Sequence, residues 1–278
     1  MADTLANNKR IAKNTLMLYF RMLLLLIISL YTSRVILREL GVDDYGIYNV
    51  VGGIIVILSF LNNTMASATQ RFLNVEMGRK DQMAVNKIFT TSQHIYFGVA
   101  LCLLVIAETA GLWFLNNYMN IPDGRLEAAN WVYQFSIISA IFGIFTVSYN
   151  AVIISHEKMS AFAYISIIEA VLKLLVTFAV IWAPFDKLIF YAALIMLIGM
   201  INCGVYVYYG FRHFEECRHF TIKTDRPMMK QMLSFSGWTV FGNLGYILHT
   251  QGIAIVINMF FTVAVNAGQG IANQVNGI

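Results

Sequence analysis

The amino-acid sequence predicts an all-α protein that crosses a membrane several times. Hydrophobic residues fill 58% of the 278 positions, charged residues only 12%, and the mean hydropathy is +0.66. A soluble domain usually carries about a quarter charged residues. The apolar residues also form long continuous blocks, whereas the strands of a membrane barrel would alternate. Because a helix needs roughly 20 apolar residues to cross the bilayer core, each block is long enough for one span.

The blocks predict seven helices and the start of an eighth. All three prolines, Pro122, Pro184 and Pro227, lie between the blocks, where a proline removes no helix hydrogen bond. Their positions support the division into helices independently of hydropathy. The expected helices cover residues 15–37, 47–70, 88–114, 128–154, 161–183, 188–210 and 232–260, and the eighth begins near Gly270.

Lysine and arginine residues gather in alternate connections. Thirteen lie before the first helix and in the second, fourth and sixth connections, while three lie in the remaining connections. Because cationic connections stay on the cytoplasmic side of a membrane, we expect the N-terminus in the cytoplasm. Trp113, Trp131 and Trp182 fall at the opposite helix ends, as an interfacial belt of aromatic residues would require.

A short segment occurs twice. The stretches YGIYNVVGGI (Tyr45–Ile54) and QGIANQVNGI (Gln269–Ile278) are identical at six of ten positions, and Gly46 and Gly270 are 224 residues apart. Each copy opens a returning helix, and six helices separate them, which predicts two parallel six-helix repeats. We therefore expect a first lobe over residues 1–210, a basic cytoplasmic linker over 211–231, and the start of a second lobe over 232–278. The chain is expected to be truncated inside that second lobe.

Five stretches of the sequence are similar to those of a known family. They are NTLMLYFRMLLLLIISLYTSRVILRELGVDDYGIYNVVGG at Asn14–Gly53, ATQRFL at Ala68–Leu73, AANWVYQFSI at Ala128–Ile137, YNAVIISHEKMSAFAYI at Tyr149–Ile165 and FFTVAVNAGQGIANQVNGI at Phe260–Ile278. With these stretches the chain resembles the Wzx-type oligosaccharide (lipopolysaccharide or O-antigen) flippases of the multidrug/oligosaccharidyl-lipid/polysaccharide exporter superfamily. The resemblance covers essentially the whole chain.

The resemblance implies a transporter of the bacterial cytoplasmic membrane and not an enzyme. Such a protein places two six-helix lobes around a central cavity that opens alternately to each side. It would pass an undecaprenyl-pyrophosphate-linked oligosaccharide from the cytoplasmic to the periplasmic leaflet. The implied partners are this lipid-linked oligosaccharide, membrane lipid and other polysaccharide-assembly proteins, with no nucleic acid. No cofactor is expected, and H⁺ or Na⁺ is a candidate coupling ion.

Three arginines lie within or at the ends of the first two spans. Charges inside a span are costly and usually face a cavity or a partner. For Arg21, two interpretations stay open: the side chain reaches back to the headgroups, or its planar fork binds the substrate's pyrophosphate in the cavity. Arg34 and Arg71 fit interface anchors better, with a role at a gate or at the headgroup as the alternative.

A pair of opposite charges lies near the middle of the fifth helix. Glu169 and Lys173 are four residues apart, hence on one helix face, and can neutralise each other. This pairing favours a structural role, and the alternative is a site for a coupling ion.

Two polar stripes at helical spacing predict residues that line the substrate cavity. Packing through small residues and interhelical hydrogen bonds would produce the same pattern. We favour cavity lining because the resemblance implies that the first, second, seventh and eighth helices surround the lumen. The predicted cavity residues are Gly52, Ser59, Asn63 and Gln70 in the second helix and Thr239, Asn243, Tyr246 and Thr250 in the seventh, together with Arg21.

Three other functions compete with flipping. A cation-coupled multidrug antiporter of the same superfamily would favour an acidic cavity, whereas the charges within the spans here include Arg21 and Lys173. A membrane enzyme, such as a polymerase or glycosyltransferase, would need larger outer loops or paired catalytic carboxylates, and Asp43–Asp44 is the only adjacent acidic pair on the outer side. The last alternative is an inert six-helix lobe. No second histidine follows His156 at ligand spacing, so no metal site is expected.

Overall fold

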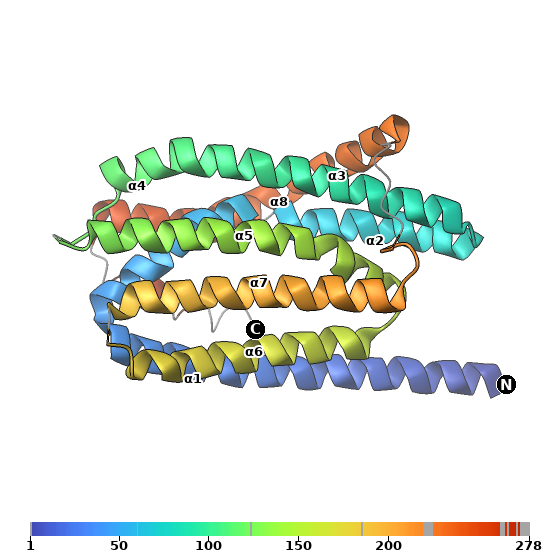
Figure 1. Cartoon of the computed structure of the whole chain (residues 1–278), viewed down its shortest axis with the longest axis horizontal. Helices are drawn as coiled ribbons and strands as arrows, with labels where there is room; N and C mark the ends of the chain where they lie inside the picture. Colours follow the sequence, from blue (N-terminus) through green and yellow to red (C-terminus); the bar gives the residue numbers. More distant parts are fainter. Residues whose placement is uncertain are drawn as a thin grey trace.

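The computed structural model describes residues 2–59, 61–122, 124–184, 186–218, 225–261, 265, 267–270 and 272. Throughout this part of the chain the regular elements are helices, which confirms the all-α fold class (Figure 1). They are α1 (Ala2–Ser59), α2 (Leu61–Arg79), α3 (Gln82–Ile106), the π-helical turn η1 (Ala107–Gly111), α4 (Leu112–Tyr118), α5 (Leu126–Ser155), α6 (Met159–Ile181), α7 (Lys187–His213) and α8 (Arg226–Phe260).

The first two expected helices meet without a loop at Gly41. This residue has φ 82° and ψ 172°, a conformation that side chains strongly disfavour and that glycine adopts without strain. The chain reverses there, at the left of Figure 1, and the second expected helix is shared between the end of α1 and α2. Hydropathy marks only the apolar part of each helix, so most observed helices extend beyond the expected bounds into polar residues.

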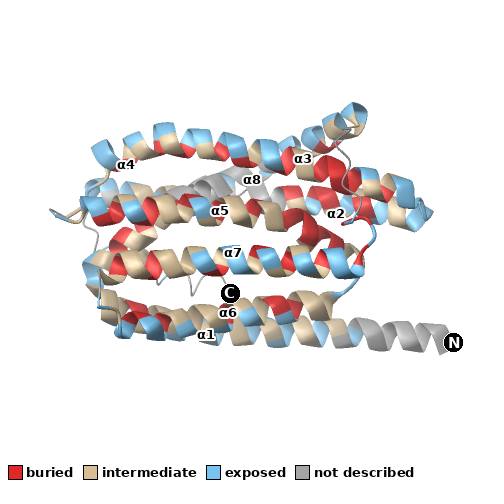
Figure 2. Ribbon diagram, viewed as in Figure 1, coloured by how far each residue is buried: buried red, intermediate tan, exposed pale blue. Residues whose placement is uncertain are grey.

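Within the part of the chain that the structure describes, five stretches are long and apolar enough to cross a membrane. They are Asn14–Gly53, Gln82–Tyr118, Leu126–Ser155, Met159–Ile181 and Lys187–His213. Figure 2 shows that many exposed residues lie along the outer faces of the helices. Large apolar side chains are among them, for example Leu23, Phe97 and Leu175, as expected for surfaces that contact lipid tails.

The buried core centres on α5, which lies between α3 and α7 (Figure 1). Tyr133 and Val152 of α5 are fully buried. The Tyr133 hydroxyl donates to the Ala107 carbonyl at 2.9 Å and so joins α5 to the π-helical turn. Beside this core, α1 packs against α6, and α6 packs against α7.

The two copies of the repeated segment touch each other. A Cβ atom added at Gly270 would lie 2.9 Å from the Cγ of Asn49, too close for a real contact. Ala267, three residues earlier, is buried with Tyr45 in one apolar cluster. Glycine at position 270 therefore lets the backbone of the second copy approach the Asn49 side chain of the first copy.

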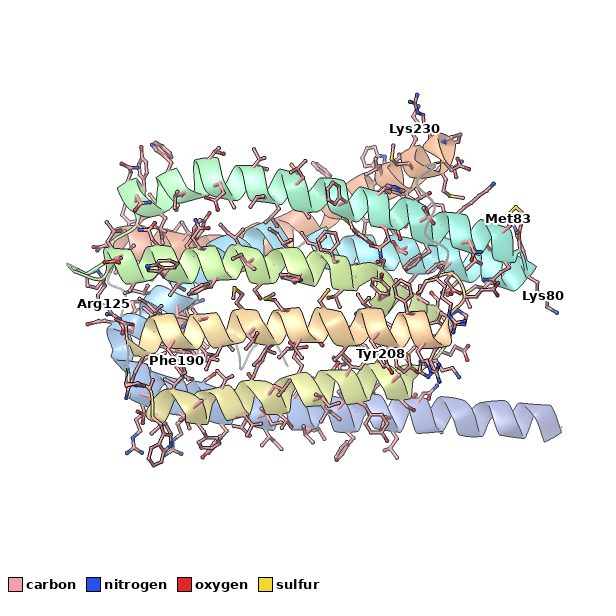
Figure 3. The ribbon with its side chains drawn as sticks, in the orientation of Figure 1. Lys80, Met83, Arg125, Phe190, Tyr208 and Lys230 are labelled. Atoms are coloured by element: carbon pink, nitrogen blue, oxygen red, sulfur yellow. The ribbon has the colours of Figure 1, made fainter. Side chains whose placement is uncertain are left out.

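The bundle has two chemically different ends, which we name the Lys80 end and the Arg125 end after residues labelled in Figure 3. At the Arg125 end, Arg125 forms ion pairs with Asp44 and Asp186. Burial opposes ionisation of Asp186, but hydrogen bonds from Arg125 and from the backbone amides of Ile189 and Leu188 outweigh burial and lower its pKa. Lys187, beside this cluster, pairs with Glu39 at 2.9 Å.

At the Lys80 end, the segment after α7 folds back onto the bundle. Glu216 is 2% exposed, and its Oε1 lies 2.6 Å from Nε2 of His156, in the turn between α5 and α6. Burial opposes ionisation of Glu216, but the hydrogen bond with His156 outweighs it and lowers the pKa of the carboxyl group. Phe214 stacks on the His156 ring with 4.4 Å between ring centroids. These contacts fix the start of the basic linker to the helices.

Candidate functional site

A polar cavity of about 470 Å³ lies between α1, α6 and α7. Sites for small ligands usually measure about 300 to 1,000 Å³, so the volume suits a headgroup or a short saccharide. Six of the lining residues belong to the part of α1 before Gly41, and one follows it. The lining consists of Arg21, Leu25, Ile28, Ser29, Thr32, Ser33, Tyr48, Ser166, Glu169, Ala170, Lys173, Tyr191 and Ile195.

Arg21 lines this cavity from α1, and its guanidinium group stacks on an aromatic ring of α6. Its guanidinium carbon lies 4.3 Å from the centroid of the Phe162 ring of α6, a cation–π contact. Its Nε is buried and has no hydrogen-bond partner. Stacking therefore orients the guanidinium group in the lining of the cavity.

Glu169 and Lys173 supply the other charges of the cavity. Lys173 Nζ donates to Glu169 Oε1 at 2.6 Å, and Asn202 of α7 donates to Glu169 Oε2 at 3.0 Å. The carboxylate of Glu169 also interacts electrostatically with Arg21. The contact between Glu169 and Lys173 is present as their spacing predicts, and its role stays a prediction.

Hydroxyl groups line the part of the cavity nearer the Arg125 end. Thr32 Oγ1 is buried without a hydrogen-bond partner. The rings of Tyr48 and Tyr191 lie 5.0 Å apart, and both residues line the cavity. An unpaired buried hydroxyl costs about 1 to 3 kcal/mol, so Thr32 lowers the stability of this region.

The charges of the cavity sum to a net positive value, because Arg21 and Lys173 face a single carboxylate, that of Glu169. The arrangement suits a ligand that combines an anionic group with a hydroxyl-rich body. Carboxylate and phosphate oxygens are the natural partners of guanidinium and ammonium groups. Among the described residues, no group of three His, Cys, Asp or Glu side chains could hold a metal ion.

The chain matches the family model for polysaccharide biosynthesis proteins over residues 11–274. This chain belongs to the polysaccharide biosynthesis protein family. The resemblance to Wzx-type flippases is thereby confirmed at the level of the family. Together with the apolar helices, membership identifies a multi-pass membrane protein of this family.

A curated relative of this family member is the uncharacterized membrane protein EpsK of Bacillus subtilis (strain 168). The two sequences are 20% identical over 239 residues, which cover 85% of this chain and 47% of EpsK. The chain therefore spans about half the length of the relative it matches. No solved structure matches the chain.

Of the residues that the sequence of this family member singles out, the structure brings Arg21, Glu169 and Lys173 together in one cavity. The neighbouring Ser29 and Thr32 were missed, although with Arg21 they share one face of α1 at spacings of eight and eleven residues. Asn202 was missed because only the packing of α7 against α6 brings it to Glu169.

The described residues of the two predicted polar stripes lie outside this cavity. Arg71 of α2 stacks over the Phe235 ring of α8 at 4.4 Å, so the second and seventh expected helices are neighbours. Gly52 and Gln70 are half-buried, and the Thr239 hydroxyl donates within α8 to the Phe235 carbonyl at 2.9 Å. None of these residues lines the cavity between α1, α6 and α7, and neither does Arg34, whose side chain is exposed. The side chains of Ser59, Asn63, Asn243, Tyr246 and Thr250 lie outside the described residues.

Proposed function

We propose that this family member forms part of a flippase that moves an undecaprenyl-pyrophosphate-linked oligosaccharide across the bacterial cytoplasmic membrane, from the cytoplasmic to the outer leaflet. In this proposal residues 1–210 form the first lobe, 211–231 the cytoplasmic linker and 232–278 the start of a second lobe. The contact between Gly270 and Asn49 supports a meeting of two lobes at the repeated segment. The N-terminus and the Lys80 end would face the cytoplasm.

The observation that carries the proposal is the charge of the cavity beside Arg21. A net positive site inside a membrane span is costly, and a bound pyrophosphate would offset that cost. The Arg21 guanidinium could bond two phosphate oxygens at once, which is the geometry that arginine favours. Beyond it, the hydroxyl groups of Thr32, Tyr48 and Tyr191 would meet the saccharide.

A cation-coupled antiporter of the same superfamily is the second candidate. The Glu169 carboxylate favours it, because an acidic group in a cavity within the membrane can bind H⁺ or Na⁺. We place it second because the cavity holds two cationic side chains and one carboxylate. Coupling of flipping to an ion gradient would fit the same residue.

The two polar stripes would line the remainder of the lumen in the complete protein, with Arg34 and Arg71 near its gates. The stripes are the one formed by Gly52, Ser59, Asn63 and Gln70 and the one on α8.

Substitution of Arg21 by alanine tests the proposal. In the full-length protein, Arg21→Ala should reduce surface polysaccharide at least tenfold in cells that depend on it, because the cation for the pyrophosphate is lost. The measurement is the surface glycan of a deletion strain carrying each variant at matched membrane abundance. Arg79→Ala is the matched control, since Arg79 pairs with Glu76 on the surface at 2.8 Å. Normal surface glycan in the Arg21→Ala strain would contradict the headgroup role.

A further inference from the structure

The Glu169 carboxylate occupies a place where the donors of the cavity converge. Lys173 of α6 and Asn202 of α7 each donate to a different oxygen, and Arg21 of α1 interacts with the same group electrostatically. An ammonium, an amide and a guanidinium are also the donors that a phosphate group would use. Glu169 therefore already holds the contacts that an anionic ligand would seek.

This ion pair faces open space. The Lys173 side chain is 43% exposed and that of Glu169 is 29% exposed, and both line the cavity. A pair that served only packing would be enclosed, because burial is what makes its two charges strongly dependent on each other. Here the lysine has room to turn on its flexible stem toward a ligand.

Asn202 keeps the Glu169 carboxylate hydrogen-bonded when Lys173 turns away from it. The amide of Asn202 bonds Glu169 Oε2, while Lys173 bonds Oε1, so the two donors do not compete for one atom. When Lys173 turns away, Glu169 stays hydrogen-bonded to α7 and remains near Arg21. The cost of opening the pair is thus limited to the ammonium contact, which an incoming anion replaces.

We propose that Glu169 acts as a resident anion, that is, a carboxylate that pairs with Lys173 while the cavity is empty. The phosphate group of the ligand then displaces Glu169 from Lys173. The inference rests on the proposed function in one respect, namely that the ligand is a lipid-linked phosphate or pyrophosphate. Lys173 is then a second cation for the ligand besides Arg21. When Glu169 returns to Lys173, it competes with the bound anion for the lysine. This competition weakens binding of the anion, so that the ligand can leave the site.

A binding experiment on the full-length protein in detergent tests this role. The probe is geranylgeranyl pyrophosphate, with geranylgeraniol as the uncharged control and inorganic pyrophosphate to separate the lipid-linked from the free anion. Glu169→Gln keeps the shape and the Asn202 contact but releases Lys173, so the affinity for geranylgeranyl pyrophosphate should rise about tenfold. Affinity for geranylgeraniol should not change. Titration calorimetry measures both.

Two further variants separate displacement from a general change in charge. Glu108→Gln removes another carboxylate from a span, one that accepts a hydrogen bond from Gln134 at 3.2 Å and does not line the cavity, and should leave the affinity unchanged. The double variant Glu169→Gln/Lys173→Met should lose the tenfold gain, because the released ammonium is absent. A gain that persists in the double variant would overturn the inference.

The outcomes distinguish the inference from the proposed function. If the native protein binds geranylgeranyl pyrophosphate better than geranylgeraniol and Glu169→Gln shows no gain, the resident-anion role is overturned while the flippase proposal stands. If neither protein prefers the pyrophosphate, both are overturned. Should Glu169→Gln fail to fold, Glu169→Asp replaces it: the shorter acid reaches Lys173 less well, and an affinity no higher than native would again overturn the inference.

Discussion

Arg125 and Arg21 both lie where helices meet, but their guanidinium groups have opposite surroundings. Arg125 bonds two carboxylates, with Nε donating to Asp44 Oδ1 at 2.8 Å and further bonds to both oxygens of Asp186. It thereby connects the turn after the first span with the starts of α5 and α7. Arg21 instead stacks on Phe162 and leaves its buried Nε without a partner.

The difference separates a structural cation from one available to a ligand. At the Arg125 end, Arg125 and Lys187 are each paired with carboxylates, so binding an anion to either cation would require breaking existing pairs. In the cavity, the positive charge exceeds the negative and two buried polar atoms have no partner. Stability and binding are therefore assigned to different arginines, and this assignment can be tested by measuring unfolding and binding on the same variants.

Loss of Arg125 should have the largest effect on stability. Arg125→Ala leaves Asp44 and Asp186 near each other without their shared cation, and we expect unfolding to become easier by about 2 to 3 kcal/mol, after allowing for partial exposure to solvent. Thermal unfolding of the full-length protein in detergent measures the change. Arg125→Lys should recover only part of it, because an ammonium cannot bond two carboxylates as a fork. An unchanged melting temperature would remove the contrast with Arg21.

A smaller effect is expected from neutralising Asp186, and it should depend on pH. Because Arg125 and two backbone amides lower the pKa of Asp186, this carboxylate stabilises the fold above its unfolded pKa of about 4. That stability is lost as the pH falls through the lower pKa of the folded state. Asp186→Asn keeps the helix cap of α7, so it should cost about 1 kcal/mol at neutral pH and flatten the decline below pH 4.

The measurement for Asp186 is chemical unfolding between pH 3 and pH 7 for both proteins. Equal slopes of stability against pH below pH 4 in the native protein and in Asp186→Asn would contradict the role given to Arg125 at this carboxylate.

The smallest effect should come from Thr32, and it should have the opposite sign. Because its buried hydroxyl has no partner, Thr32→Val should stabilise the protein by about 0.5 to 1 kcal/mol. The same change should weaken binding of a saccharide-bearing lipid pyrophosphate several-fold while leaving geranylgeranyl pyrophosphate unaffected. Thermal unfolding and calorimetry on one preparation give both numbers. Destabilisation by Thr32→Val would mean that the hydroxyl is satisfied in the native protein.

The contrast between the two arginines could be foreseen only in part from the sequence. Hydropathy and the positions of the prolines located the helices, because the bilayer requires a continuous apolar run of fixed length. The four-residue spacing of Glu169 and Lys173 predicted their contact, because one helical turn brings such residues together. Arg125 was counted only as a charge in an outer connection, since its partners are 81 and 61 residues away.

What the sequence by itself determined is therefore local or periodic: an all-α membrane fold built from long apolar helices, with Arg21 as a predicted cation. Tertiary structure decided which polar residues share a space. It placed Arg21, Thr32 and Glu169 in one cavity between α1, α6 and α7, whereas Gly52, Gln70 and Thr239 of the predicted stripes do not line that cavity. The physical reason is that helix periodicity fixes the face a residue occupies, whereas the neighbour of that face depends on how whole helices pack.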